Sequence, residues 1–194
     1  MNLRKLSIIA CVVICGALVA HAVQDGMEDM QKKWMDYMTP GKQHQEMAAS
    51  AGKWDVKSSF WMMPGGEPMV SSAKSTIETS MDNRYLIENF EGTMMGMPYQ
   101  GMGLFGYDNL TKKYWGTWVD SMGTGPTNMS GTRTGNKVEY HGTMADVMAG
   151  KHVPVRFVQT TIDADHHTLE MFSKGPDGKE FRGMFLEYSR QGAQ

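Results

Sequence analysis

From Lys53 onward, turn-forming residues recur at short and regular intervals, and this feature restricts the possible folds more than any other. Between the turns, apolar and polar residues alternate with a period of two, as they do in strands that bury one face. The alternation predicts strands over residues 53–62, 69–80, 84–92, 99–107, 113–120, 127–134, 136–143, 152–162, 166–174 and 179–190. The separating turns lie at residues 64–66, 82–83, 96–98, 108–109, 123–125, 135–136, 163–165 and 175–178.

About ten short strands that are joined mostly by tight turns, without crossover helices between them, form successive antiparallel hairpins. An up-and-down barrel closes such a long sheet and removes its exposed edges. The sequence therefore predicts a mainly β fold, an antiparallel up-and-down β-barrel with an interior wide enough to hold a ligand. A two-sheet sandwich is the alternative that the pattern leaves open.

The residues before Lys53 follow a helical period instead. Methionine and tryptophan recur every fourth residue between charged side chains, which predicts a helix over residues 27–38. Thr39-Pro40-Gly41 breaks this pattern, and a second short helix is predicted over residues 44–51. We therefore expect a helical segment, residues 23–52, that plugs or flanks one opening of a barrel domain, residues 53–190.

The first 22 residues have the three parts of a secretory signal peptide. Arg4 and Lys5 form a positive start, residues 6–20 are apolar, and Ala20-His21-Ala22 offers small residues to the signal peptidase. The apolar run is shorter than the roughly 20 residues that cross a bilayer, which favours cleavage after Ala22 over a retained anchor. The mature protein is expected to be exported to the periplasm or outside the cell, without stable membrane insertion.

Cysteine content and charge exclude several classes of function. Cys11 and Cys15 are the only cysteines and both lie in the apolar run, so the mature chain has none for a disulfide, a nucleophile or a thiolate ligand. The 19 basic and 21 acidic side chains nearly balance and form no block of like charge. This distribution is unlike the basic footprint of nucleic-acid-binding proteins, so no nucleic-acid partner is expected.

Several short motifs follow one another in a fixed order. They are Tyr37 with Pro40-Gly41-x-x-His44, then Ala51-Gly52-x-Trp54, Arg84-Tyr85-Leu86, Gly103-x-x-Gly106-Tyr107-Asp108, Trp118-x-Asp120-Ser121-Met122-Gly123 and Tyr188-x-Arg190. Together they resemble the bacterial domain of unknown function 1579 (DUF1579) over residues 35–190. The resemblance implies a lipocalin-like barrel and no established activity. One departure is Asp82-Asn83, where two glycines would be expected before the arginine.

The segment 113–120 carries the first candidates for a binding site. Tyr114, Gly116, Trp118 and Asp120 share one face of this strand. If that face points inward, a carboxylate lies beside an indole inside the barrel. A buried charge requires a partner, and arginine is the residue expected to provide it.

Arginines on other strands are the candidate partners, namely Arg84, Arg156 and Arg182. For each of them, a structural ion pair or an outward-facing position is the alternative. Tyr107 would add aromatic surface to the cavity. The predicted ligand-binding residues are therefore Trp118, Asp120, Tyr107, Arg156 and Arg84.

Methionine is unusually frequent, with 20 residues in the chain. Thioethers bind soft metals such as Cu(I), and the segment Met94-Met95-Gly96-Met97 is the best candidate for such a site. The alternative is that methionine replaces the scarce leucine as an apolar core residue. No metal site is therefore assigned, and copper binding is kept as a second hypothesis.

No motif of a known catalytic class is present: the chain has neither Gly-x-Ser-x-Gly nor His-Glu-x-x-His. Gly101-x-Gly103-x-x-Gly106 opens no helix, so it is not a dinucleotide fingerprint. An enzyme would have to use Asp120 or His44, and no catalytic residue or cofactor is assigned. The leading hypothesis is noncovalent binding of a small apolar or amphipathic molecule inside the barrel.

Overall fold

The computed structural model describes residues 24–192, and these divide between Thr39 and Pro40 into two compact units. In the first unit, residues 24–38 form a helix with exposed side chains, so the helix predicted over residues 27–38 is present. Among the described residues, no helix is long and apolar enough to cross a membrane. The signal peptide predicted over residues 1–22 lies outside the described residues.

In the second unit, the helix α2 (Lys42–Ala48) precedes the first strand. His44 closes its first turn, because the ring Nδ1 accepts a hydrogen bond from the Gly41 backbone N–H at 3.0 Å. The ring Nε2 donates to the backbone carbonyl of Tyr107, 3.1 Å away, and so fastens α2 to a barrel strand. α2 starts and ends earlier than the predicted residues 44–51, since His44 caps the helix from within its first turn.

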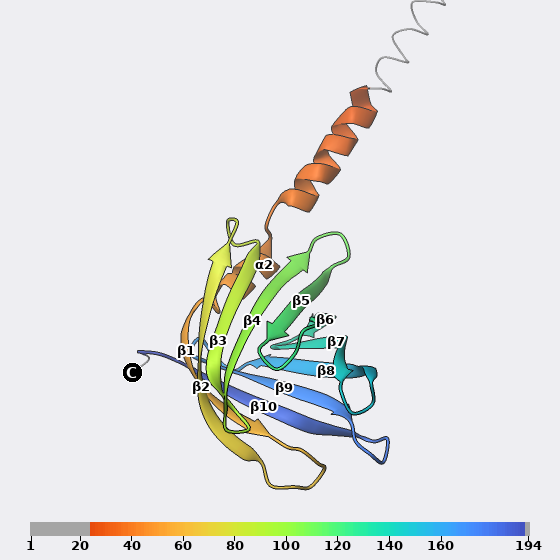
Figure 1. Cartoon of the computed structure of the whole chain (residues 1–194). Coiled ribbons are helices and arrows are strands. Elements are labelled where there is room, and N and C mark those ends of the chain that lie inside the picture. Colours follow the sequence, from red (N-terminus) through yellow and green to blue (C-terminus); the bar gives the residue numbers. More distant parts are fainter. Residues whose placement is uncertain (1–23, 193–194) are drawn as a thin grey trace, which may run out of the picture. The chain divides into compact units, whose positions relative to one another are not determined.

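Ten antiparallel strands form a closed barrel (Figure 1). Each strand pairs with its sequence neighbours, and the first pairs with the last, from Trp54 opposite Arg190 to Phe60 opposite Met184. This up-and-down topology confirms the predicted fold class and excludes the sandwich. The strands are β1 (Gly52–Phe60), β2 (Met69–Ser80), β3 (Tyr85–Met94), β4 (Met97–Asp108), β5 (Lys113–Asp120), β6 (Thr127–Thr134), β7 (Lys137–Asp146), β8 (Lys151–Thr161), β9 (His166–Lys174) and β10 (Glu180–Arg190).

The β2–β3 turn shows how the chain manages without the two glycines expected before Arg84. Met81, Asp82 and Asn83 all adopt left-handed backbone conformations, with φ of 51°, 55° and 63°. Aspartate and asparagine tolerate this region better than most other residues. Arg84 braces the turn by donating a hydrogen bond from Nη1 to the carbonyl of Met81 at 3.0 Å. Asp82-Asn83 is thus a workable substitute for glycine.

Inward-facing side chains form two buried clusters. One involves β1, β2, β3, β4 and β10 and includes Trp54 and Phe90, and the other involves β5, β7 and β8 and includes Tyr140 and Phe157. α2 lies at the end of the barrel where β4 ends (Figure 1). We call this the α2 end. The opposite end, where β3 turns into β4 and β5 turns into β6, is called the open end.

Candidate ligand-binding cavity

A cavity of about 540 Å³ occupies the interior of the barrel. Side chains of α2, including Met47, line it at the α2 end. At the open end it is lined by Met62, Met95 and Val147, which are 66%, 50% and 87% exposed, so the cavity reaches the surface there. Small-molecule sites commonly have this size and combine an apolar lining with a few fixed polar groups.

The first polar group of the cavity surrounds Asp120, the last residue of β5. The Tyr99 hydroxyl and the Trp118 indole N–H each donate a hydrogen bond to its Oδ2, both at 3.2 Å. The backbone N–H of Met122 donates to Oδ1 at 2.9 Å. Pairing of Gly101 in β4 with Asp120 brings Tyr99 within reach of the carboxylate. Asp120 is therefore held by three donors, none of which is an arginine.

The second polar group surrounds Glu88 on β3, which is only 8% exposed. Its Oε1 accepts hydrogen bonds from the Ser75 hydroxyl at 2.7 Å and the Tyr188 hydroxyl at 3.2 Å. Burial raises the pKa of Glu88, and the two hydrogen bonds oppose this shift only partly. The pKa of Tyr188 is also raised, chiefly by burial and further by the nearby Glu88. These groups form a polar wall that favours uncharged side chains.

His167 on β9 extends this wall. Its ring stacks on Tyr188 with centroids 4.2 Å apart and meets the edge of Trp54 at 4.4 Å. Burial, with a smaller contribution from the charge of Arg190, lowers the pKa of His167 to about 4. The ring is therefore neutral near pH 7 and lies against the cavity.

Arg190 has a structural role next to this wall. Its guanidinium lies 4.2 Å above the Trp54 ring and donates to the backbone carbonyls of Ala51 and Ala49 at 2.7 and 2.9 Å. A further bond from Nε reaches the carbonyl of Ala164 at 3.1 Å. The tryptophan of the Gly52-x-Trp54 motif and the arginine of the Tyr188-x-Arg190 motif thus meet at the α2 end and close the barrel there.

The glycines of β4 make room for the rings of the cavity. A Cβ atom on Gly101 would lie 2.2 Å from the Trp118 ring, and one on Gly103 would lie 2.3 Å from the Phe105 ring. Neither position can carry a side chain without moving an aromatic residue. The Gly101-x-Gly103 spacing therefore serves ring packing in the barrel interior.

The structure brings together only part of the predicted binding site. Trp118 and Asp120 line the cavity side by side, as the inward orientation of their strand face requires. Tyr107 packs its ring against Tyr114 at 4.9 Å, outside the lining. Arg84 belongs to the β2–β3 turn. Arg156 bonds to Glu180 through Nε at 3.0 Å, on the outer side of β8.

Glu88, Tyr99 and His167 are the cavity residues that sequence reasoning missed. For Glu88 a signal existed, because it shares a strand face with Leu86 and Phe90, where a charged side chain is out of place. Tyr99 and His167 gave no such signal, because tyrosine and histidine occur both in cores and on surfaces. Only the strand register places them next to Asp120 and Tyr188.

The copper-binding and enzyme hypotheses gain little support from this geometry. Met94 and Met95 line the cavity, whereas Met97 does not. Among the described residues, no group of three or more histidine, cysteine, aspartate or glutamate side chains is placed to hold a metal ion. Both ring nitrogens of His44 are occupied by the contacts that hold α2, which leaves neither of them for proton transfer.

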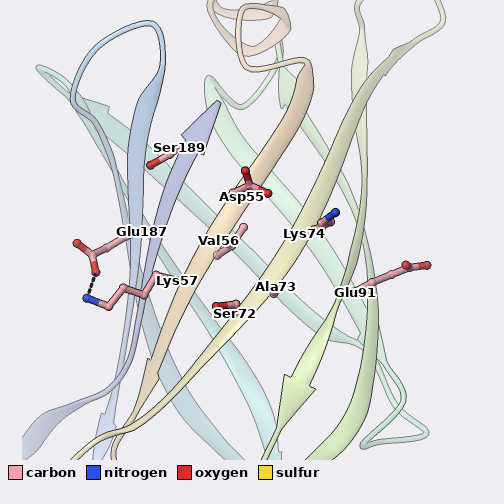
Figure 2. A pocket seen from close by; sticks show the side chains of 9 residues that line it. All are labelled: Asp55, Val56, Lys57, Ser72, Ala73, Lys74, Glu91, Glu187 and Ser189. Atoms are coloured by element: carbon pink, nitrogen blue, oxygen red, sulfur yellow. Dashed lines mark ion pairs between the residues drawn. The ribbon is translucent and has the colours of Figure 1, made fainter. Parts of the chain in front are cut away.

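A shallow charged groove on the outside of the barrel is the second concave region (Figure 2). It crosses β1, β2, β3 and β10, where Asp55 pairs across the strands with Lys74, and Lys74 with Glu91. Lys57 forms an ion pair with Glu187 at 3.6 Å, and these side chains are 63% and 45% exposed. The groove has the alternating charges of a solvent-facing sheet surface.

A closed antiparallel barrel around a ligand-sized interior defines this protein as a small β-barrel of the cavity-containing class. The chain belongs to the family described as protein of unknown function (DUF1579), whose family model matches residues 39–190. The predicted family membership is thus confirmed. No curated protein matches the chain significantly.

The comparison with solved structures found two matches to report. Rv2717c from M. tuberculosis is 12% identical with a TM-score of 0.57, and the similarity covers 79% of this chain and 99% of that one. A redesigned β-barrel, b11L5F_LGL, is 15% identical with a TM-score of 0.40, over 74% of this chain and 95% of that one. At these identities, the similarity to Rv2717c supports the fold alone.

Proposed function

We propose that this protein binds a small amphipathic molecule, noncovalently, inside its barrel. The observation that carries the proposal is an apolar cavity of about 540 Å³ into which two fixed polar groups project, one around Asp120 and one around Glu88. The apolar lining would receive the body of the ligand, and the polar groups would orient its head. Export to the periplasm or beyond, with cleavage after Ala22, is part of this proposal.

Native mass spectrometry of the protein from the exported fraction of its own host tests both parts. We expect a chain that begins at Val23 and carries an additional mass of a few hundred daltons, the size that a cavity of this volume accommodates. A copper-sized increment would support the methionine hypothesis instead. A reproducibly ligand-free protein would contradict the binding role, and an intact N-terminus would contradict export by cleavage.

Two tryptophan variants localise the bound molecule. Trp118→Ala removes a ring that lines the cavity, so the retained ligand should fall roughly tenfold or more because aromatic surfaces dominate such contacts. Trp115→Ala is the matched control. Trp115 lies on the same strand, β5, but its ring packs on Gly106 at the outer face of the barrel. Equal losses in both variants would place the ligand elsewhere.

A further inference from the structure

The cavity offers no free positive charge. Among the described residues that line it, Arg133 is the only lysine or arginine. Its Nη1 is 2.7 Å from Oε2 of Glu46 on α2, and its Nε donates to the carbonyl of Gly135 at 2.9 Å. This arginine is thus neutralised at the α2 end, and an anionic head group inside the barrel would find no unpaired cation.

A negatively charged group, Asp120, lies near the open end. Asp120 accepts three hydrogen bonds, and because a carboxylate has about four lone-pair sites, it can accept one more from a ligand. Phe90 lies edge-on to Tyr99 at 5.9 Å and to Trp118 at 6.2 Å. A carboxylate beside a group of aromatic rings is the arrangement that attracts an organic cation.

His167 supplies an independent observation. The ring is 7% exposed, lines the cavity, and forms no hydrogen bond with another described residue. A neutral imidazole has one nitrogen that accepts and one that donates a hydrogen bond. Because the ring lines the cavity, these two nitrogens are available to a ligand that carries hydrogen-bonding groups.

We propose that the molecule held in the barrel is an amphipathic amine whose protonated nitrogen faces Asp120 and whose apolar body lies among the aromatic and methionine side chains. This inference rests on the proposed binding function. A carboxylate head would be desolvated opposite Asp120 with no compensating cation, which is unfavourable. A neutral head would leave the charge of Asp120 unused.

Three probes that share a naphthyl group separate an amine, a neutral and a carboxylate head group. They are 2-(2-naphthyl)ethylamine, 2-(2-naphthyl)ethanol and the carboxylate of 2-naphthylacetic acid. Isothermal titration calorimetry of the protein at pH 7 gives the affinity of each. We expect the amine to bind roughly tenfold or more tightly than the alcohol, because a charge-assisted contact adds to the shared apolar burial. The carboxylate should bind most weakly.

Variants assign the preference to residues. Asp120→Asn should reduce amine affinity about tenfold and leave the alcohol within about twofold, because only the charged contact is lost. Glu91→Gln, which removes a carboxylate from the outer groove, should leave both affinities unchanged. The comparison of head groups in the unmodified protein tests the proposal even if Asp120→Asn fails to fold.

The outcomes separate the two proposals. Equal or tighter binding of the alcohol or the carboxylate would overturn the amine assignment and leave the binding barrel intact. An unchanged preference for the amine in folded Asp120→Asn would overturn the role of Asp120. Failure of all three probes to bind would contradict the proposed function itself as well as the amine assignment.

Discussion

Glu88 and Asp120 are carboxyl groups on the inner face of the same barrel, yet their surroundings differ in kind. Glu88 is almost fully buried, and both of its donors are neutral hydroxyl groups that bond to one oxygen. Asp120 lies at the open end of β5 and receives donors on both oxygens, including a backbone N–H. Burial therefore raises the pKa of Glu88 and favours its neutral form, whereas hydrogen-bond donors hold both oxygens of Asp120.

This difference gives the cavity a neutral wall and a charged wall. The neutral wall contains Glu88, Tyr188 and His167, and burial shifts the pKa of all three toward the uncharged form. The charged wall contains Asp120 with Tyr99 and Trp118. Four predictions test the distinction, beginning with the largest expected effect.

A positive charge at position 88 should be the most damaging change. Glu88→Lys places an ammonium group in the neutral wall, and we expect a loss of about 3–5 kcal/mol in the free energy of unfolding, measured by urea denaturation. Glu91→Lys, on the exposed face of the same strand, should change it by less than about 0.5 kcal/mol. Equal losses in the two variants would show that position 88 is not a buried site.

Acid should destabilise the protein through His167. The pKa of His167 is near 6.5 in the unfolded chain and about 4 in the folded protein, so the unfolded chain binds a proton first as the pH falls. The stability from neutral His167 is therefore complete above pH 6.5 and is lost as the pH falls to 4, by up to about 3 kcal/mol. His167→Phe, which keeps a ring on Tyr188, should flatten the pH dependence in this window.

His152→Gln is the control for that experiment, because His152 is exposed at the start of β8. It should retain the pH dependence of the unmodified protein. Urea denaturation at several pH values measures both variants. A His167→Phe protein that still loses the same stability between pH 6.5 and 4 would contradict a buried neutral imidazole.

Amide substitutions at the two carboxyl groups should act in opposite directions. The pKa of Glu88 is raised, so stability is highest below the unfolded value near 4.5 and decreases as the pH rises through the folded value. Glu88→Gln removes this decrease and should stabilise the protein by about 1 kcal/mol at pH 8, with no gain at pH 4.

Asp120→Asn should instead destabilise the protein by about 1–2 kcal/mol, since an amide has one oxygen for three donors. Thermal unfolding followed by circular dichroism compares both amide variants with the unmodified protein. Shifts of the same sign would remove the distinction between the two walls.

The outer groove should contribute least. Lys57→Ala breaks the exposed ion pair with Glu187, and the free energy of unfolding should change by less than about 0.5 kcal/mol. The affinity for 2-(2-naphthyl)ethylamine should also stay unchanged. A clear loss of binding would move the ligand from the barrel interior to the groove.

Much of the fold could be predicted from the sequence, because turn residues and alternation are local signals. All ten strands are present close to their predicted positions, and the face of β5 with Trp118 and Asp120 points inward. The partner of Asp120 could not be predicted in the same way. That partner depends on the register between β4 and β5, which brings Tyr99 within hydrogen-bond distance of Asp120. Arg84 instead belongs to the β2–β3 turn, and Arg156 pairs with Glu180 on the outer side of β8.

The state of the inner carboxyl groups was equally out of reach, because burial and hydrogen bonding are properties of the closed barrel. Glu88 and Glu91 lie three residues apart on β3, yet the first is 8% exposed and the second faces the outer groove. Alternation indicates that they face opposite sides. It does not indicate that Ser75 and Tyr188 meet on one oxygen of Glu88.

A crystal structure of the protein with 2-(2-naphthyl)ethylamine tests the central claim most directly. We predict the naphthyl ring inside the barrel, against Trp118, and the nitrogen within hydrogen-bond distance of an Asp120 carboxylate oxygen. Electron density for the amine in the groove of Asp55 and Lys74, or an empty barrel in crystals of a protein that binds the amine in solution, would contradict the account.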